Sequence, residues 1–166
     1  MVVTFFAAGA LATNATTTTL NVVMPASLAT GDILIIAVLA KDNQVHTFPS
    51  SEVDGISAWT KFVQFNNTTA QRMTLAWARV TNGANASGNT VAVTKPTDNN
   101  VLFCGVASAW RGCVASGDPT TSAGTPTTSA NGTSDTVTYA TFDPSIACHV
   151  VAVGVYNLDE IGRAHV

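Results

Sequence analysis

Three segments of this chain, residues 31–41, 100–112 and 147–157, are apolar on both faces of an extended strand. The apolar run within the first, DILIIAVLA, has only about half the length that a membrane-spanning helix needs. A short strand that is apolar on both faces suits the interior of a sheet that is covered on both sides. The three segments therefore predict central strands of a buried sheet.

Five more segments have the length and the alternating pattern of strands: residues 17–25, 59–67, 72–81, 89–96 and 135–142. Turn-forming residues separate them, and no segment repeats apolar residues at helical spacing over three turns, so we expect little helix. The resulting eight strands predict an all-β, antiparallel two-sheet β-sandwich of jelly-roll type rather than a βαβ fold.

The connections differ in length. Residues 41–58 and 116–134 predict two long loops, and residues 81–89 predict a short hairpin connection. Loops on a rigid scaffold often carry binding residues, so we expect contacts with other molecules at the two long loops.

The strand patterns also predict individual side chains. Along residues 59–67, simple alternation places Lys61 and Val63 on one face of the strand. Trp59, Trp77 and Trp110 all lie within strands, where large aromatic side chains are usually buried, so we expect all three in the core.

Composition narrows the class of protein. Charged residues make up 10% of the 166 positions, against about 25% in an average soluble domain. Hydrophobic residues make up 46%, which is too many for a disordered chain. The net charge is −3 with only seven Lys and Arg, so we expect neither nucleic-acid binding nor attraction to an anionic membrane.

The three cysteines do not form a disulfide framework, because their number is odd. Cys104 and Cys148 lie in apolar runs, which favours buried free thiols, and a single bridge that involves Cys113 is the alternative.

No catalytic, cofactor-binding or metal-binding set emerges, and we expect the protein not to be an enzyme. The motifs G-x-S-x-G, C-x-x-C and H-E-x-x-H are missing from the sequence. In residues 41–43 and 97–100, Asp and Asn have the oxygen atoms that calcium prefers, but the same residues form turns, and we favour that interpretation. His46 is expected in solvent and His149 in a core or an interface.

The two ends of the chain need separate interpretation. The opening residues, MVVTFFAAGALA, lack the basic residues of a signal peptide. The final Ile161–Val166 resembles the translated start of a widely used sequencing adapter. We therefore expect residues 1–160 to be a single, incomplete domain and residues 161–166 to be a non-native addition to an environmental gene fragment.

Four motifs occur in a familiar order. They comprise Pro25, Gly31, Asp32 and Leu34; Trp59 and Thr60; Trp77, Arg79, Val80 and Gly83; and Trp110, Arg111, Gly112 and Pro119. Together with an opening strand, their order over residues 2–157 resembles a family of β-sandwich domains in structural proteins of tailed bacteriophages, mainly tail-fibre-like proteins. Trp110 stands where that family has Tyr, and Cys113 where it has Val.

The resemblance implies a non-enzymatic virion structural protein, assembled in the host cytoplasm and displayed on a tail fibre or the particle surface. Its implied partners are other virion subunits, including copies of itself, and a glycan or protein of the host surface. A secreted bacterial carbohydrate-binding or adhesion module is the alternative. A polysaccharide-cleaving tail component would require convergent carboxylates or a His–acid pair, which the sequence does not display.

Overall fold

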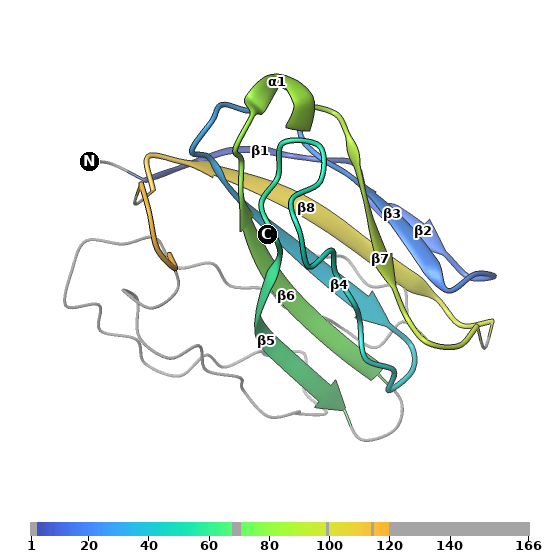
Figure 1. Cartoon of the computed structure of the whole chain (residues 1–166). Coiled ribbons are helices and arrows are strands. Elements are labelled where there is room, and N and C mark those ends of the chain that lie inside the picture. The colour runs from blue at the N-terminus through green and yellow to red at the C-terminus, as the bar shows by residue number, and fades with distance from the viewer. Residues whose placement is uncertain (1–2, 68–70, 99, 114, 120–166) are drawn as a thin grey trace.

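A computed structural model of the chain describes residues 3–67, 71–98, 100–113 and 115–119 (Figure 1). Five sequence predictions lie outside these residues: the strands at 135–142 and 147–157, Cys148 and His149, and the tail 161–166. Within the described part, no helix is long and apolar enough to span a membrane.

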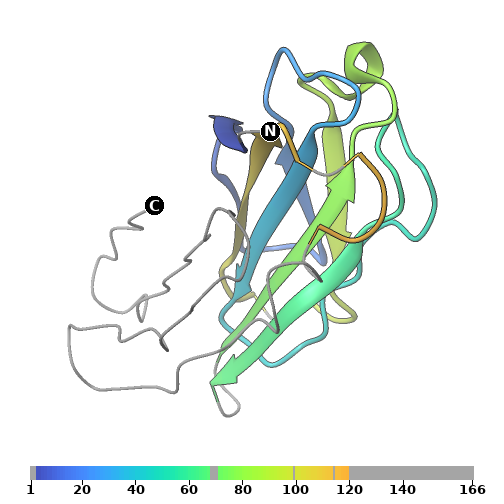
Figure 2. The ribbon, with the colours of Figure 1, turned by 90° about the vertical axis from the view of Figure 1, so that its left-hand side faces the viewer.

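The described residues form eight strands and one four-residue helix. In chain order these are β1 (Thr4–Ala8), β2 (Ala12–Asn14), β3 (Thr19–Val23), β4 (Ile33–Ala40), β5 (Thr60–Asn67), β6 (Gln71–Arg79), α1 (Gly83–Ala86), β7 (Thr90–Thr94) and β8 (Phe103–Arg111). One sheet has the order β1-β8-β4-β6-β5, with β2 also paired to β8, and the second sheet consists of β3 and β7. All these pairs are antiparallel. The predicted two-sheet antiparallel sandwich is confirmed (Figure 2).

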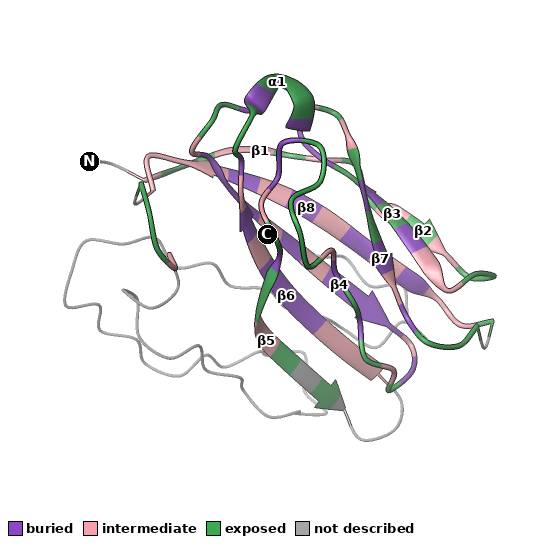
Figure 3. Cartoon of the chain, viewed as in Figure 1, coloured by how far each residue is buried: buried purple, intermediate pink, exposed green. Residues whose placement is uncertain are grey.

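Strands β4 and β8 both lie in the interior of the large sheet, as their apolar sequences predicted, and β6 is a third interior strand. Leu34 and Ile36 of β4 are fully buried and belong to the core between the two sheets. Figure 3 shows buried positions along β4. Leu34 and Ile36 each lie between two alanines, one on β6 and one on β8. These small neighbours leave room for side chains of the second sheet, and burial of each large residue contributes roughly 1.5–3 kcal/mol.

Residues 81–89 were expected to form a hairpin, and this prediction is wrong. The segment carries the chain from β6 in the large sheet to β7 in the small one, and it contains α1. The Asn82 side chain caps α1 by accepting hydrogen bonds from the backbone N–H groups of Ala84 and Asn85. Turn residues in the sequence mark a change of direction but do not say which sheet the chain enters next.

A β-bulge in β5 overturns the expected alternation along this strand. Lys61 is opposite Ala76, but Val63 is opposite Leu75, so one extra residue is inserted between them. A bulge shifts the two-residue period, and Lys61 and Val63 therefore lie on opposite faces of the sheet.

Of the three tryptophans expected in the core, only Trp59 is there, at 8% exposure. Trp77 and Trp110 are half-buried on the face of the large sheet that points away from the second sheet. The ring of Trp110 meets that of Phe5 edge to face, with centroids 5.5 Å apart. Because β6 and β8 have apolar residues on both faces, their sequences could not show which face lies against the second sheet.

Candidate functional site

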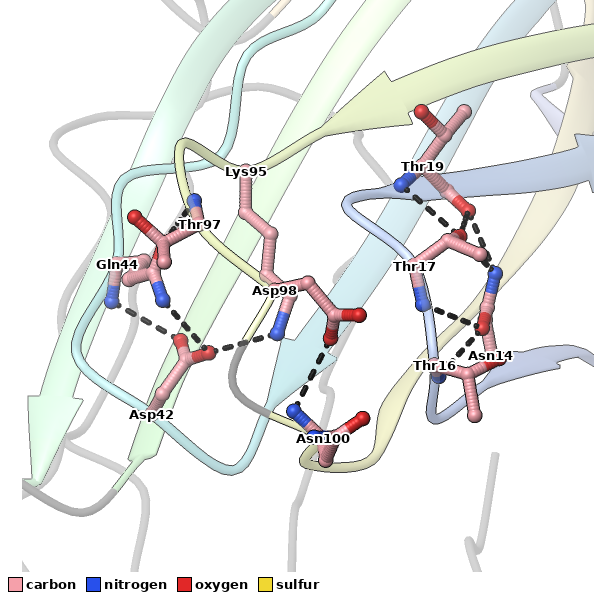
Figure 4. Close-up of polar contacts among 10 residues, drawn as sticks. All are labelled: Asn14, Thr16, Thr17, Thr19, Asp42, Gln44, Lys95, Thr97, Asp98 and Asn100. Atoms are coloured by element: carbon pink, nitrogen blue, oxygen red, sulfur yellow. Dashed lines mark hydrogen bonds and ion pairs between the residues drawn. The ribbon is translucent and has the colours of Figure 1, made fainter.

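Three connections meet at one end of the sandwich, because Asn14 and Ala40 are both opposite Phe103 on β8. They are residues 15–18 between β2 and β3, residues 41–47 after β4, and residues 95–102 between β7 and β8, of which residue 99 is not described. We call these three connections the loop end (Figure 4). Their exposed side chains are mainly Thr and Asn, so the loop end presents hydrogen-bonding groups with little charge.

The first of these connections is ordered by Asn14. Its side-chain oxygen accepts hydrogen bonds from the backbone N–H groups of Thr16, at 2.9 Å, and Thr17, at 3.2 Å. Its side-chain nitrogen donates to the backbone carbonyl of Thr19, at 2.8 Å. An asparagine that bonds its own backbone in this way fixes the turn, so Thr16 and Thr17 are held exposed in a defined position.

The two sequence segments with calcium-like ligands also meet here, joined by the backbone N–H of Thr97, which donates to the side chain of Gln44 (Figure 4). The carboxylate of Asp98 accepts a hydrogen bond from the backbone N–H of Asn100, which confirms turn formation there. Asp42 accepts from the backbone N–H of Gln44 and also forms an ion pair. No group of three potential metal-ligating side chains gathers among the described residues.

Beneath these loops lies a buried ion pair. Lys95 Nζ and Asp42 Oδ2 are 2.9 Å apart, and the two side chains are 0% and 6% exposed. The ammonium lies 5.7 Å from the centroid of the Phe103 ring, and the backbone N–H of Lys95 donates to the carbonyl of Thr18. Removal of two charges from water costs free energy, which largely offsets the attraction between them. Such a pair therefore adds little to the free energy of unfolding, and its main effect is to fix the positions of the segments that it joins. The pair ties the three connections together.

His46 was expected in solvent, and this prediction is wrong. It is 0% exposed, its Nδ1 lies 2.9 Å from the Thr74 hydroxyl, and its ring stacks on Phe103 with centroids 5.3 Å apart. Burial lowers the pKa of His46 to about 4, and the nearby charge of Asp42 opposes this only partly. His46 Nε2 has no hydrogen-bond partner among the described residues. Because Thr74 is also fully buried, a substrate has no access to this His–Thr pair.

The segment 41–58 contains no helix or strand, as expected for a long loop, but its first half is packed into the sandwich. The buried side chains of this half are those of Asp42, His46 and Phe48, which follow one another at intervals of four and two residues. Thr47 forms an isolated β-bridge with Thr94 at the edge of the second sheet. This half of the segment therefore extends the second layer of the sandwich. The exposed stretch is residues 50–54. Of the other expected contact loop, only residues 116–119 are described.

At the opposite end of the sandwich, Arg111 and Asp32 form a two-pronged ion pair. Arg111 Nε donates to Oδ1 at 2.9 Å and Nη2 donates to Oδ2 at 2.7 Å, and the guanidinium lies 3.8 Å from the centroid of the Phe6 ring. Burial raises the pKa of Asp32, but Arg111 and the backbone N–H of Ala29 outweigh it and hold the pKa below its usual value. This end of the sandwich therefore has its own buried carboxylate, fixed by a cation.

The two thiols in the described part, Cys104 and Cys113, are free and half-buried, and burial raises the pKa of each. Thiolate formation, which reactivity requires, is thereby disfavoured.

We compared the chain with protein-family models, curated proteins and solved structures, and none of them matches it.

Proposed function

We propose that this chain is a non-enzymatic structural protein of a tailed-bacteriophage particle, carried on a tail fibre or on the particle surface. In this role the sandwich is a rigid scaffold. The loop end makes contact with a glycan or protein of the host surface or with other virion subunits, including further copies of the chain.

The ion pair between Asp32 and Arg111 is the observation that carries the proposal. These residues come from the first and the last of the four motifs on which the phage resemblance rests, and they are separated by 79 positions in the chain. Gly31, beside Asp32, has a φ of 94°, a conformation that favours glycine. Because residues of two separate motifs contact each other in the fold, the motifs have a structural role in this chain, which supports the resemblance over a chance likeness of Thr-rich sequences.

The geometry of the loop end supports a role in contact rather than catalysis. Asn14 fixes the exposed Thr16 and Thr17, and the ion pair of Asp42 and Lys95 fixes the neighbouring loops from below. Groups that are already held in place lose little conformational entropy on binding, which favours affinity. Exposed hydroxyl and amide groups are suited to hydrogen bonds with sugars or with polar protein surfaces.

The genomic position of the intact gene tests the proposal. Long-read sequencing of the source community would recover the gene with its neighbours, and we expect portal, capsid and tail genes around it. A secretion signal on the intact frame, with no phage genes nearby, would instead support the secreted bacterial adhesion module.

Substitutions in a phage that carries the intact gene test the role of the loop end. Thr16→Arg places a bulky charged side chain on the loop end, and Asn85→Arg places the same side chain on exposed α1 at the other end. We expect the first to lower adsorption to host cells by about thirtyfold, which corresponds to a hot-spot effect of about 2 kcal/mol, and the second to leave it unchanged. Equal adsorption by both variants would exclude the loop end as the host-contact surface.

A further inference from the structure

The ion pair of Lys95 and Asp42 has features that a solvent-exposed pair lacks. Lys95 follows β7 of the small sheet and Asp42 follows β4 of the large sheet, so the pair joins the two layers of the sandwich. Its nitrogen and oxygen are 2.9 Å apart, and the side chains are 0% and 6% exposed (Figure 4). An amine and a carboxyl group thus face each other where water has little access.

We propose that Lys95 and Asp42 form a covalent cross-link, an amide bond between Nζ of Lys95 and Cγ of Asp42. A proton first passes from the ammonium to the carboxylate, which leaves an amine and a carboxylic acid. The lone pair of Nζ attacks Cγ, the bond from Cγ to one oxygen breaks, and that oxygen leaves as water with one proton from the nitrogen. Nothing is oxidised or reduced, and no further reactant is needed.

Two physical effects drive this condensation in the folded protein. The fold holds Nζ of Lys95 2.9 Å from Oδ2 of Asp42, so the entropy of bringing the amine and the carboxyl group together is already lost. Burial of two opposite charges is unfavourable compared with burial of a neutral group of similar size, so the amide removes a desolvation cost that the ion pair retains. Exclusion of water also protects the bond from hydrolysis.

His46 lies next to the ion pair but makes no hydrogen bond to Lys95 or Asp42, so the proton passes directly between the two reacting groups. The ring of His46 stacks on Phe103, and the Lys95 ammonium also lies over the Phe103 ring. Burial lowers the pKa of His46, and the negative charge of Asp42 offsets part of this lowering. The Nε2 atom of His46 is buried and has no hydrogen-bond partner among the described residues.

The test is an intact-mass measurement on the folded full-length chain, recorded in a denaturing solvent. We expect a mass that is lower than that of the sequence by one water molecule. A proteolytic digest should then contain one branched species that joins the peptide with Asp42 to the peptide with Lys95. A chain recovered unfolded from inclusion bodies and never allowed to fold should have the full mass.

Variants separate this bond from other losses of water. Lys95→Met and Asp42→Ala should each have the full mass, and Lys61→Met, which removes an amine that only reaches the carbonyl oxygen of His46 at 3.3 Å, should keep the deficit. Cyclisation at Asp54 and Gly55 would also release water, but it would leave the two peptides separate. Full mass in the folded wild-type chain, or a deficit without the branched species, would overturn the proposal, whether or not the Lys95 and Asp42 variants fold.

Discussion

Acidification should destabilise this protein through His46. The buried, neutral imidazole has a pKa of about 4 in the folded state and about 6.5 in the unfolded state. Between these values the unfolded chain binds a proton that the folded chain excludes, so the free energy of unfolding falls as the pH falls from 6.5 to 4. Below pH 4 both states bind the proton, and this contribution no longer changes.

The size of the effect follows from the shift. A difference of 2.5 pKa units between 6.5 and 4 corresponds to about 3 kcal/mol at 1.36 kcal/mol per unit. The slope cannot exceed about 1.4 kcal/mol per pH unit, because a single group binds one proton. Since a typical domain has only about 5–15 kcal/mol of stability, this one side chain should set much of its acid sensitivity.

The measurement compares the wild-type chain with His46→Phe in urea unfolding from pH 7 to pH 4, followed by tryptophan fluorescence. The phenyl ring can still stack on Phe103, but it does not titrate, and it leaves the Thr74 hydroxyl without its imidazole partner. We expect the variant to be less stable at pH 7 and this difference to shrink, or to reverse, by about 3 kcal/mol at pH 4. Parallel pH profiles for the two proteins would refute the assignment.

Two further substitutions test the packing of the opposite end. Arg111→Met removes the partner of buried Asp32, so burial should raise the pKa of that carboxyl above its usual value. We expect this variant to be less stable than the wild-type chain at neutral pH. The difference should become smaller in acid, because Asp32 is then protonated. An equal loss of stability at neutral and at acidic pH, measured by urea unfolding, would contradict this. Gly83→Ala would place a methyl group 2.3 Å from the backbone carbonyl oxygen of Leu28, so it should cost about 1–3 kcal/mol, and an unchanged melting temperature would contradict the close approach.

The sequence predicted the central strands because their identity depends on a local property. A stretch such as residues 31–41, apolar at nearly every position, can only be accommodated between neighbours and under cover on both faces. Which face of β6 or β8 lies against the second sheet is a long-range property, and here the prediction for Trp77 and Trp110 was wrong. The bulge before Val63 likewise depends on the partner strand and left no mark in the sequence.

The candidate site was harder to predict for the same reason. Asp42 and Lys95 are 53 positions apart, and each alone resembles an ordinary turn residue. In the structure, buried and less buried side chains alternate around His46, and Phe48 is the next buried side chain along the segment. The polar character of that segment hid the period, since its inward polar side chains find their partners in distant strands.

Protein composition of purified particles tests the proposed function most directly. A tailed phage that carries the intact gene would be purified from its host, and its proteins digested and identified by mass spectrometry. We predict peptides from residues 3–119 in the particle fraction, in amounts comparable with those of known tail proteins. Peptides found only in the bacterial culture medium and missing from purified particles would contradict the proposal.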